Sequence, residues 1–332
     1  MEHDVRAAPP RPKRQRCSAE AGDLEVAPRP AVRMESDAAT GNFFVATRPI
    51  SAGEVVLRRI LGRILGRIPT AACWALEPDE RHRRCRGCAA LCADADEETE
   101  SAAPSPAPAP CAGCGQLLCC RGCRERGAPG RADDDPHAVE CAVLQQLGPG
   151  VGSTVLILIR LLIGELDERD AAGGGGGGGR SKMRTLIDSL GGHADDIGTE
   201  ELSHRASWTA QLVDIVEHAY SQTKPPPSDV TVAADTAAIA ADAVDSTAAA
   251  AAATAELKRA ALACLNVIAV NGHAIVLHEP CRDIAAVIGH SIDAELAIMN
   301  HACVPSSFLS WELTPGQPPA ANLRATQVHH TV

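Results

Sequence analysis

The sequence is poor in aromatic residues and in positive charge. Its 332 residues include three Trp, one Tyr and three Phe, whereas alanine, glycine and proline are abundant. Parts of the chain therefore lack the large apolar side chains of a packed core, and we expect disordered linkers between two or three domains. The formal net charge of −11 argues against direct binding to nucleic acid, because such binding draws on a basic surface.

Long hydrophobic segments are also missing. The most apolar run, Val155 to Ile163, is nine residues long and contains Arg160, whereas a bilayer span needs roughly 20 apolar residues. No apolar stretch follows the charged N-terminus MEHDVRAAPPRPKRQR, so we predict an intracellular protein without a membrane span, in the nucleus, the cytoplasm or both. The basic stretch Arg11 to Arg16 fits either a nuclear import signal or a solvated tail.

Cysteine, in contrast, is abundant and clustered. Fourteen cysteines in a reducing compartment need a role other than disulfides, and metal binding is the usual one. A short spacing lets both side chains of a pair reach one ion at about 2.3 Å, and eight ligands suffice for two closed, tetrahedral zinc sites. The predicted ligands form four pairs: Cys85 with Cys88, Cys111 with Cys114, Cys119 with Cys123, and His137 with Cys141. Spacing favours Cys119 over the adjacent Cys120, but either residue fits.

The arrangement of these pairs resembles the MYND zinc finger, in which the first pair joins the third and the second joins the fourth. The resemblance implies that Cys85, Cys88, Cys119 and Cys123 hold one zinc ion, and that Cys111, Cys114, His137 and Cys141 hold the other. The insertions at 89–110 and 124–136 are longer than is common in the family. Both are polar or rich in proline, so they can loop out without disturbing the ligands.

Segments on either side of the finger resemble a SET domain, the fold of protein-lysine methyltransferases. The stretch TGNFFVATRPISAGEVVLRR (40–59) predicts two short strands around a turn, and it resembles the opening of the SET domains that a MYND finger interrupts. Further along the chain, ACLNVIAVNGHAI (263–275) resembles an apolar segment of this family, and MNHACVP (299–305) resembles its NHxCxPN motif. The resemblance implies an α+β fold, a split β-rich SET domain interrupted by the finger and a helical insert.

The same resemblance implies a site for S-adenosylmethionine. Asn300 and His301 would contact this cofactor, and Gly41, Asn42 and Asn271 would complete its pocket. Taken alone, the short Asn-His motif also fits a capped turn whose histidine makes its hydrogen bonds within the protein. The order of the motifs along the chain favours the cofactor.

The catalytic tyrosine of the family has no counterpart near the expected strand LRAT (323–326), because the sequence continues QVHHTV. The only tyrosine, Tyr220, is remote from that motif, and Cys303 is the last cysteine, so we expect a buried thiol there. The sequence thus predicts a SET-MYND chain truncated before its catalytic tyrosine and post-SET segment, with no catalytic residue. The alternative is a non-catalytic adaptor whose finger binds partner peptides, often rich in proline. In either case we expect a monomer.

The predicted organisation follows from these assignments. Val155 to Asp170 predicts a buried helix that ends in an acidic, solvated turn, and Met183 to Tyr220 predicts two amphipathic helices. Residues 221–256, which change from proline-rich to alanine-rich, have few large apolar side chains, so we expect a loosely ordered linker there. The predicted segments are a disordered tail (1–31), a first SET segment (32–75), the finger (82–145), a helical insert (146–220) with a glycine joint (173–179), the linker (221–256) and a second SET segment (257–332).

Overall fold

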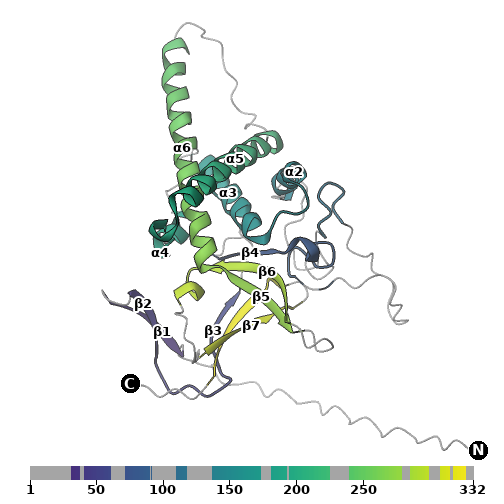
Figure 1. Ribbon diagram of the computed structural model, residues 1–332, viewed down its shortest axis with the longest axis vertical. Coiled ribbons are helices and arrows are strands. Elements are labelled where there is room, and N and C mark those ends of the chain that lie inside the picture. The colour runs from purple at the N-terminus through teal and green to yellow at the C-terminus, as the bar shows by residue number, and fades with distance from the viewer. Residues whose placement is uncertain are drawn as a thin grey trace, which may run out of the picture.

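The computed structural model of the chain has a layer of helices packed over a group of small β-sheets (Figure 1). The fold is therefore mixed α/β. The strands are β1 (Val32–Asp37), β2 (Gly41–Ala46), β3 (Val55–Ile60), β4 (Ala72–Leu76), β5 (His273–His278), β6 (Ala285–Asp293), β7 (Ser307–Glu312) and β8 (Ala320–Ala325). The helices are α2 (His137–Leu147), α3 (Ser153–Ala172), α4 (Lys182–Ser189), α5 (Thr199–Thr223) and α6 (Ile239–Asn271), with 3-10 turns η1 (Pro78–Glu80), η2 (Ala194–Asp196) and η3 (Leu296–Ile298).

The description covers only part of the chain. The structure describes residues 31–37, 41–60, 72–89, 91, 110–117, 137–172, 181–192, 194–224, 239–278, 285–298, 307–314 and 317–326. Among the predictions, the tail before residue 31, the glycine joint 173–179 and Cys303 lie outside these residues.

Two of the sheets join strands that are far apart in the sequence. Strand β8 lies between β3 and β7, and β6 lies between β4 and β5, with every pair antiparallel. In these sheets Leu57 is opposite Leu323, and Cys73 is opposite Ile292. The described helices come between the paired strands in sequence. This is the arrangement expected of a sheet-forming region that an insertion has split.

The two strands predicted within residues 40–59 exist, but they do not form a hairpin with each other. Strand β2 pairs with β1, and β3 pairs with β8. The turn between them is attached to β8, because the backbone N–H of Gly53 donates to Ala325 O at 2.8 Å and the N–H of Ala325 donates to Glu54 O at 3.0 Å. Local pattern predicted the strands correctly, whereas pairing depended on a strand more than 250 residues away in sequence.

Helix α3 forms the centre of the hydrophobic core. Its consecutive residues Leu156, Ile157, Leu158 and Ile159 are all fully buried, because β4, α5 and α6 pack around the helix. A helix that is apolar all round is expected to be enclosed in this way. Each such side chain contributes about 1.5–3 kcal/mol through burial. The acidic end of the helix reaches solvent at Glu168, as the sequence predicts.

The two amphipathic helices predicted between residues 183 and 220 correspond to α4 and α5. Ser181 begins the first by accepting a hydrogen bond at its Oγ from the N–H of Arg184, at 3.2 Å. The apolar positions Leu186, Leu212 and Val216 are buried in the core. The helical spacing of the apolar residues was therefore sufficient to predict both elements.

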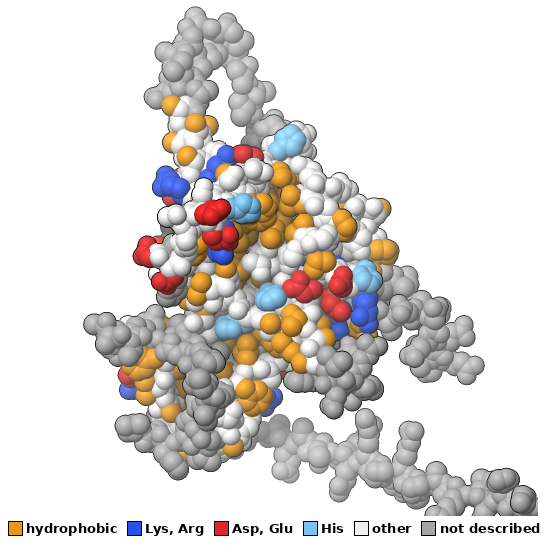
Figure 2. Space-filling view, in the orientation of Figure 1, with side chains coloured by type: hydrophobic (Ala, Val, Ile, Leu, Met, Phe, Trp, Pro, Cys, Tyr) orange, Lys and Arg blue, Asp and Glu red, His pale blue; other side chains and the backbone are white. Residues whose placement is uncertain are grey.

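The predicted linker 221–256 is wrong over its second half, because α6 begins at Ile239 and continues to Asn271. Alanine has the highest helix propensity, and the far end of the helix is anchored by buried residues such as Leu257, Cys264 and Ile268. The N-terminal half of α6 projects from the body (Figure 1), and Ala248 to Ala253 in this half are exposed. In Figure 2 this projection carries apolar side chains and charged groups gather at its base, where Arg184 and Arg259 both pair with Glu256.

Candidate metal centre

The two CxxC turns have the same backbone geometry, although they lie far apart in the sequence. We call Cys85–Cys88 the first knuckle and Cys111–Cys114 the second knuckle. In each, the residue after the second cysteine donates its N–H to the carbonyl of the first, from Ala89 and from Gly115, both at 2.8 Å. These two residues have positive φ angles of 55° and 73°. An antiparallel bridge closes each turn at equivalent positions, Arg84 with Leu91 and Pro110 with Leu117.

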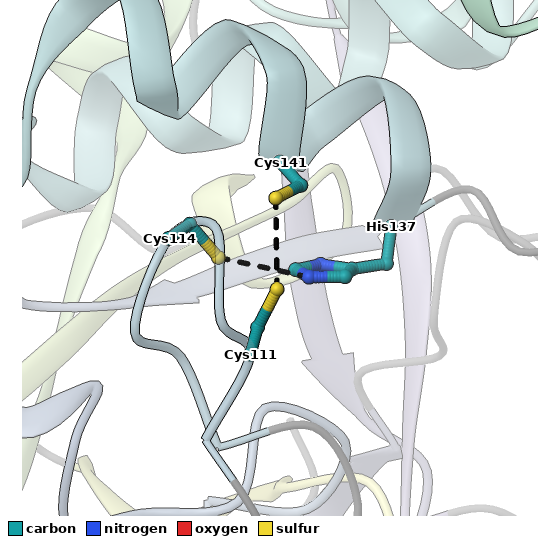
Figure 3. A group of neighbouring side chains, drawn as sticks. All are labelled: Cys111, Cys114, His137 and Cys141. Atoms are coloured by element: carbon teal, nitrogen blue, oxygen red, sulfur yellow. Dashed lines mark hydrogen bonds between the residues drawn. The ribbon is translucent and has the colours of Figure 1, made fainter.

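The start of helix α2 supplies the remaining ligands of one cluster. His137 is the first residue of α2, and Cys141 follows four positions later. Residues four apart lie on the same helical face, so both side chains point toward the second knuckle (Figure 3). A rigid turn and a rigid helix therefore each provide two ligands.

The four side chains converge on one point (Figure 3). The Sγ atoms of Cys111 and Cys141 are 3.6 Å apart, and Cys114 Sγ is 3.6 Å from His137 Nε2. All four ligand atoms lie within 4.8 Å of one another. A tetrahedral zinc ion with bonds of about 2.3 Å to sulfur and about 2.05 Å to nitrogen has edges of about 3.75 Å between sulfurs and about 3.5 Å between sulfur and nitrogen. The two distances are therefore close to the edges of a metal-binding tetrahedron.

Close approach of the knuckle to α2 requires a glycine at position 113. A Cβ atom on Gly113 would lie 2.6 Å from Cys141 Sγ and 2.3 Å from Gln145 Nε2. The exposed Gln145 side chain can turn aside, but Cys141 Sγ belongs to the cluster, so any larger residue would push the turn away from the helix or displace this ligand. The CAGC spacing alone does not reveal this requirement, because it depends on the packing of α2.

Ionisation of all three thiols in the cluster is unfavourable unless a cation lies among them. Burial raises the pKa of Cys141 to about 12 and also raises that of Cys114. Burial opposes ionisation of Cys111 as well, but hydrogen bonds from the backbone N–H groups of Cys114 and Gly113 and from the Cys141 and Cys114 side chains together lower its pKa. Three adjacent thiolates need a positive charge among them, and a divalent cation supplies it. The cluster can hold such an ion.

A buried ion-pair network connects the first knuckle and the ligand-bearing helix α2 with the core. Glu140 is 1% exposed and lies between the ligands His137 and Cys141 in sequence. Its Oε2 accepts from Arg86 Nη2 at 2.7 Å and from Arg160 Nε at 3.0 Å. Burial alone would raise the pKa of Glu140, but Arg160 and Arg86 hold it well below its usual value. Arg160 also donates to Trp74 O, so the network extends from the first knuckle through α2 and α3 to β4.

The predicted set Cys85, Cys88, Cys119 and Cys123 is described only in part. Cys85 and Cys88 are fully buried in the first knuckle, and the N–H of Gly87 donates to Cys85 Sγ at 3.3 Å. Cys119 and Cys123, together with the alternative Cys120, lie outside the described residues. The described chain therefore contains half of this predicted site.

Of the residues predicted to contact S-adenosylmethionine, Asn300 and His301 lie outside the described residues. Gly41 and Asn42 begin β2, which contacts η3, the turn just before the Asn-His motif. Asn271 ends α6, and its Nδ2 donates to Gly191 O at 2.9 Å and to Val267 O at 3.0 Å. Within the described chain its Oδ1 makes no hydrogen bond, so only that atom is available to a ligand.

Tyr220 belongs to the helical layer. Its hydroxyl lies 2.9 Å from Asp167 Oδ1 and 2.8 Å from Asp170 Oδ2. Burial and these two carboxylates raise its pKa. Lys224 also lies over its ring, with Nζ 4.9 Å from the centroid. The Tyr220 side chain is therefore held in place by its contacts at the C-terminal ends of α3 and α5.

Sequence reasoning missed the Arg86–Glu140–Arg160 network. Its signal was present, because Arg86 stands inside CRGC and Glu140 inside HAVEC. Arginine and glutamate are usually solvated, however, and only packing shows that these two are buried together.

Comparison with models of protein families gave no match, and comparison with curated proteins gave none. None of the helices formed by the described residues is long and apolar enough to cross a membrane. Functional assignment therefore depends on the metal-ligand geometry and on the sequence resemblance.

Proposed function

We propose that Cys111, Cys114, His137 and Cys141 form a structural zinc site. Three thiolates and an imidazole suit zinc, whereas magnesium and calcium prefer oxygen ligands. The 3.6 Å separations support this choice. Four protein ligands complete a tetrahedron and leave no position for a substrate, so the ion would stabilise the finger rather than catalyse a reaction.

We assign a second structural zinc to the first knuckle, with Cys119 and Cys123 as its remaining ligands. Support comes from the backbone geometry that Cys85–Cys88 shares with Cys111–Cys114. The ligand pairing itself rests on the resemblance to MYND fingers. Burial of both described cysteines agrees with a closed site.

We further propose that the chain is a SET-MYND protein of the S-adenosylmethionine-dependent protein-lysine methyltransferase family. Support comes from the order of the motifs, from sheets built of strands on both sides of the insertion, and from the contact between β2 and η3. Gly41, Asn42, Asn271, Asn300 and His301 would hold the cofactor by resemblance. When bound, this cofactor supplies a methyl group on a positively charged sulfur.

This chain by itself would not transfer that methyl group. The reaction needs a deprotonated lysine amine held in line with the methyl group in a dry channel, and the family orients it with a tyrosine. The only tyrosine of the sequence is Tyr220, and Asp167 and Asp170 hold its hydroxyl in the helical layer. This observation favours the second candidate function, a non-catalytic adaptor that binds partner peptides through its finger.

Metal analysis of the purified full chain tests the zinc assignment. Native mass spectrometry combined with elemental analysis should give two zinc ions per chain, retained on dialysis against metal-free buffer. Zero or one would contradict the proposal.

Calorimetry with S-adenosylmethionine tests separately whether the chain acts as an enzyme or as an adaptor. We expect weak binding or none, because the tyrosine that would complete the site is elsewhere. Micromolar affinity would contradict this expectation and would favour the enzyme over the adaptor.

A further inference from the structure

A pocket of about 300 Å³ opens beside the second knuckle. Its wall comes from three parts of the chain: the turn that contains η1, the second knuckle with the residues just after it, and the C-terminal part of α2. The lining residues that matter below are Pro78, Arg81, Cys114, Gln116, Leu144 and Pro149. Of the four proposed metal ligands, only Cys114 is among the residues that line the pocket, so the pocket adjoins the metal cluster.

Gln116 in this wall has an unsatisfied hydrogen-bonding group. The residue is 2% exposed, and its Nε2 has no hydrogen-bond partner within the described structure. A buried, unpaired polar group costs about 1–3 kcal/mol, and such groups are rare in folded proteins. An acceptor atom supplied by a ligand in the pocket would remove that cost.

Arg81 in the same wall carries a buried charge. The residue is 6% exposed. Its Nε donates to Leu76 O at 3.1 Å and its Nη2 donates to Val151 O, and both acceptors are uncharged. No carboxylate of a described residue forms an ion pair with it. Burial lowers the pKa of Arg81, which means that its surroundings disfavour the positive charge.

The backbone segments that carry these two side chains are adjacent, because the N–H of Leu117, the residue after Gln116, donates to Arg81 O at 3.0 Å, and both residues line the same pocket. Around them, Pro78, Leu144 and Pro149 supply apolar surface. We propose that this pocket binds a carboxylate, with one ligand oxygen toward Arg81 and the other toward Gln116. Charge-assisted hydrogen bonds of this kind are stronger than neutral ones.

The volume suits a chain terminus, an acidic side chain or a small free acid, which share this chemistry. The inference goes beyond the zinc and methyltransferase assignments and does not depend on the SET-MYND family. A negative result here would leave the metal analysis unaffected.

Titration of the zinc-loaded full chain with four small probes tests the proposal. The probes are acetate, N-acetyl-Ala-Ala with a free C-terminal carboxylate, the same dipeptide with a C-terminal amide, and N-acetyl-Ala-Glu-Ala-amide. NMR should show a shift of the Gln116 side-chain amide, and the amide-capped dipeptide should bind at least about tenfold more weakly than the best carboxylate. The strongest of the three carboxylates identifies the source: a free acid, a chain terminus or a side chain.

The variant Gln116→Met keeps the volume of the side chain and removes the amide. We expect binding to weaken about tenfold, with unchanged or higher thermal stability because an unpaired buried amide is lost. Gln211→Met, on the exposed face of α5, is the matched control and should bind as the wild type does. The proposal is overturned if Gln116→Met binds as tightly as the wild type. It is also overturned if no carboxylate probe binds better than the capped dipeptide, a result that needs no variant.

Discussion

The two knuckles share a backbone but differ in their surroundings. The first is enclosed: Cys85, Cys88 and Ala89 are all fully buried, and Ala89 packs with Trp74 and Ile275. The second stands at the edge of a pocket, with Cys111 and Cys114 only half buried. A short CxxC pattern can therefore encode the geometry of a metal-binding turn, whereas exposure of that turn depends on what packs against it.

This difference has a consequence for any metal that the two knuckles bind. A chelator or an oxidant reaches half-buried thiolates more readily than enclosed ones. The second knuckle, which adjoins the pocket, is therefore the better placed of the two to exchange or lose its ion. The first knuckle is tied to the sheets by Arg86 and the Glu140 network.

The largest expected effect is loss of a metal ion. Cys114→Ala and Cys88→Ala should each reduce the zinc content by one ion per chain, because structural zinc sites bind with about 10–16 kcal/mol of apparent free energy at neutral pH. Cys88→Ala should also loosen the sheets, since Cys88 is fully buried, whereas Cys114→Ala should leave them intact. Elemental analysis and hydrogen exchange of β4 and β6 measure the two effects.

Cys264→Ala is the control for these variants, because Cys264 is a core residue of α6 remote from both knuckles in sequence. It should keep both zinc ions. Retention of two ions by Cys88→Ala would show that the first knuckle is not a zinc ligand, and the comparison would then fail.

A smaller effect is expected from breaking the link between the knuckles. Glu140→Gln removes the buried carboxylate that Arg86 and Arg160 share, and the loss of one partner of a buried ion pair costs about 3–5 kcal/mol. Urea unfolding of the zinc-loaded protein measures this change. Glu201→Gln, which removes the exposed partner of Arg205 on α5, is the matched control and should have little effect. Equal stabilities for the two variants would indicate that the network does not couple the knuckles to the core.

The smallest expected effect tests the shared backbone directly. Gly115→Ala should cost about 1 kcal/mol, because an L-residue is strained at positive φ, and a methyl group there would meet no atom within 4 Å. In the first knuckle, Ala89→Gly relieves the same strain but removes a fully buried methyl group, worth about 0.8 kcal/mol. The two terms nearly cancel, so its stability should change little. Thermal unfolding of both variants measures this difference, and a stabilising Gly115→Ala would show that the turns are not equivalent.

Local sequence patterns predicted many elements correctly. Helical spacing identified α4 and α5, an apolar run identified α3, and short spacing identified the pairs Cys111–Cys114 and His137–Cys141, which the resemblance to MYND fingers then joined into one cluster. These succeed because a period of 3.6 residues or a spacing of two to four residues is a property of neighbouring residues. The wrong prediction over 239–256 also came from a local pattern, because few large apolar residues indicated a linker. The helix forms there because alanine has a high helix propensity and because buried residues after position 256 anchor it.

By itself, then, the sequence indicated the paired cysteines of the two CxxC turns, the helical faces and the two strands within residues 40–59. Tertiary structure alone decided that β3 pairs with β8 instead of β2, that Glu140 joins two arginines in the interior, and that one knuckle is enclosed while its twin adjoins a pocket beside Arg81 and Gln116. The reason is physical. Pairing, burial and charge compensation depend on groups that are distant in the chain, and no local pattern encodes which of them will meet.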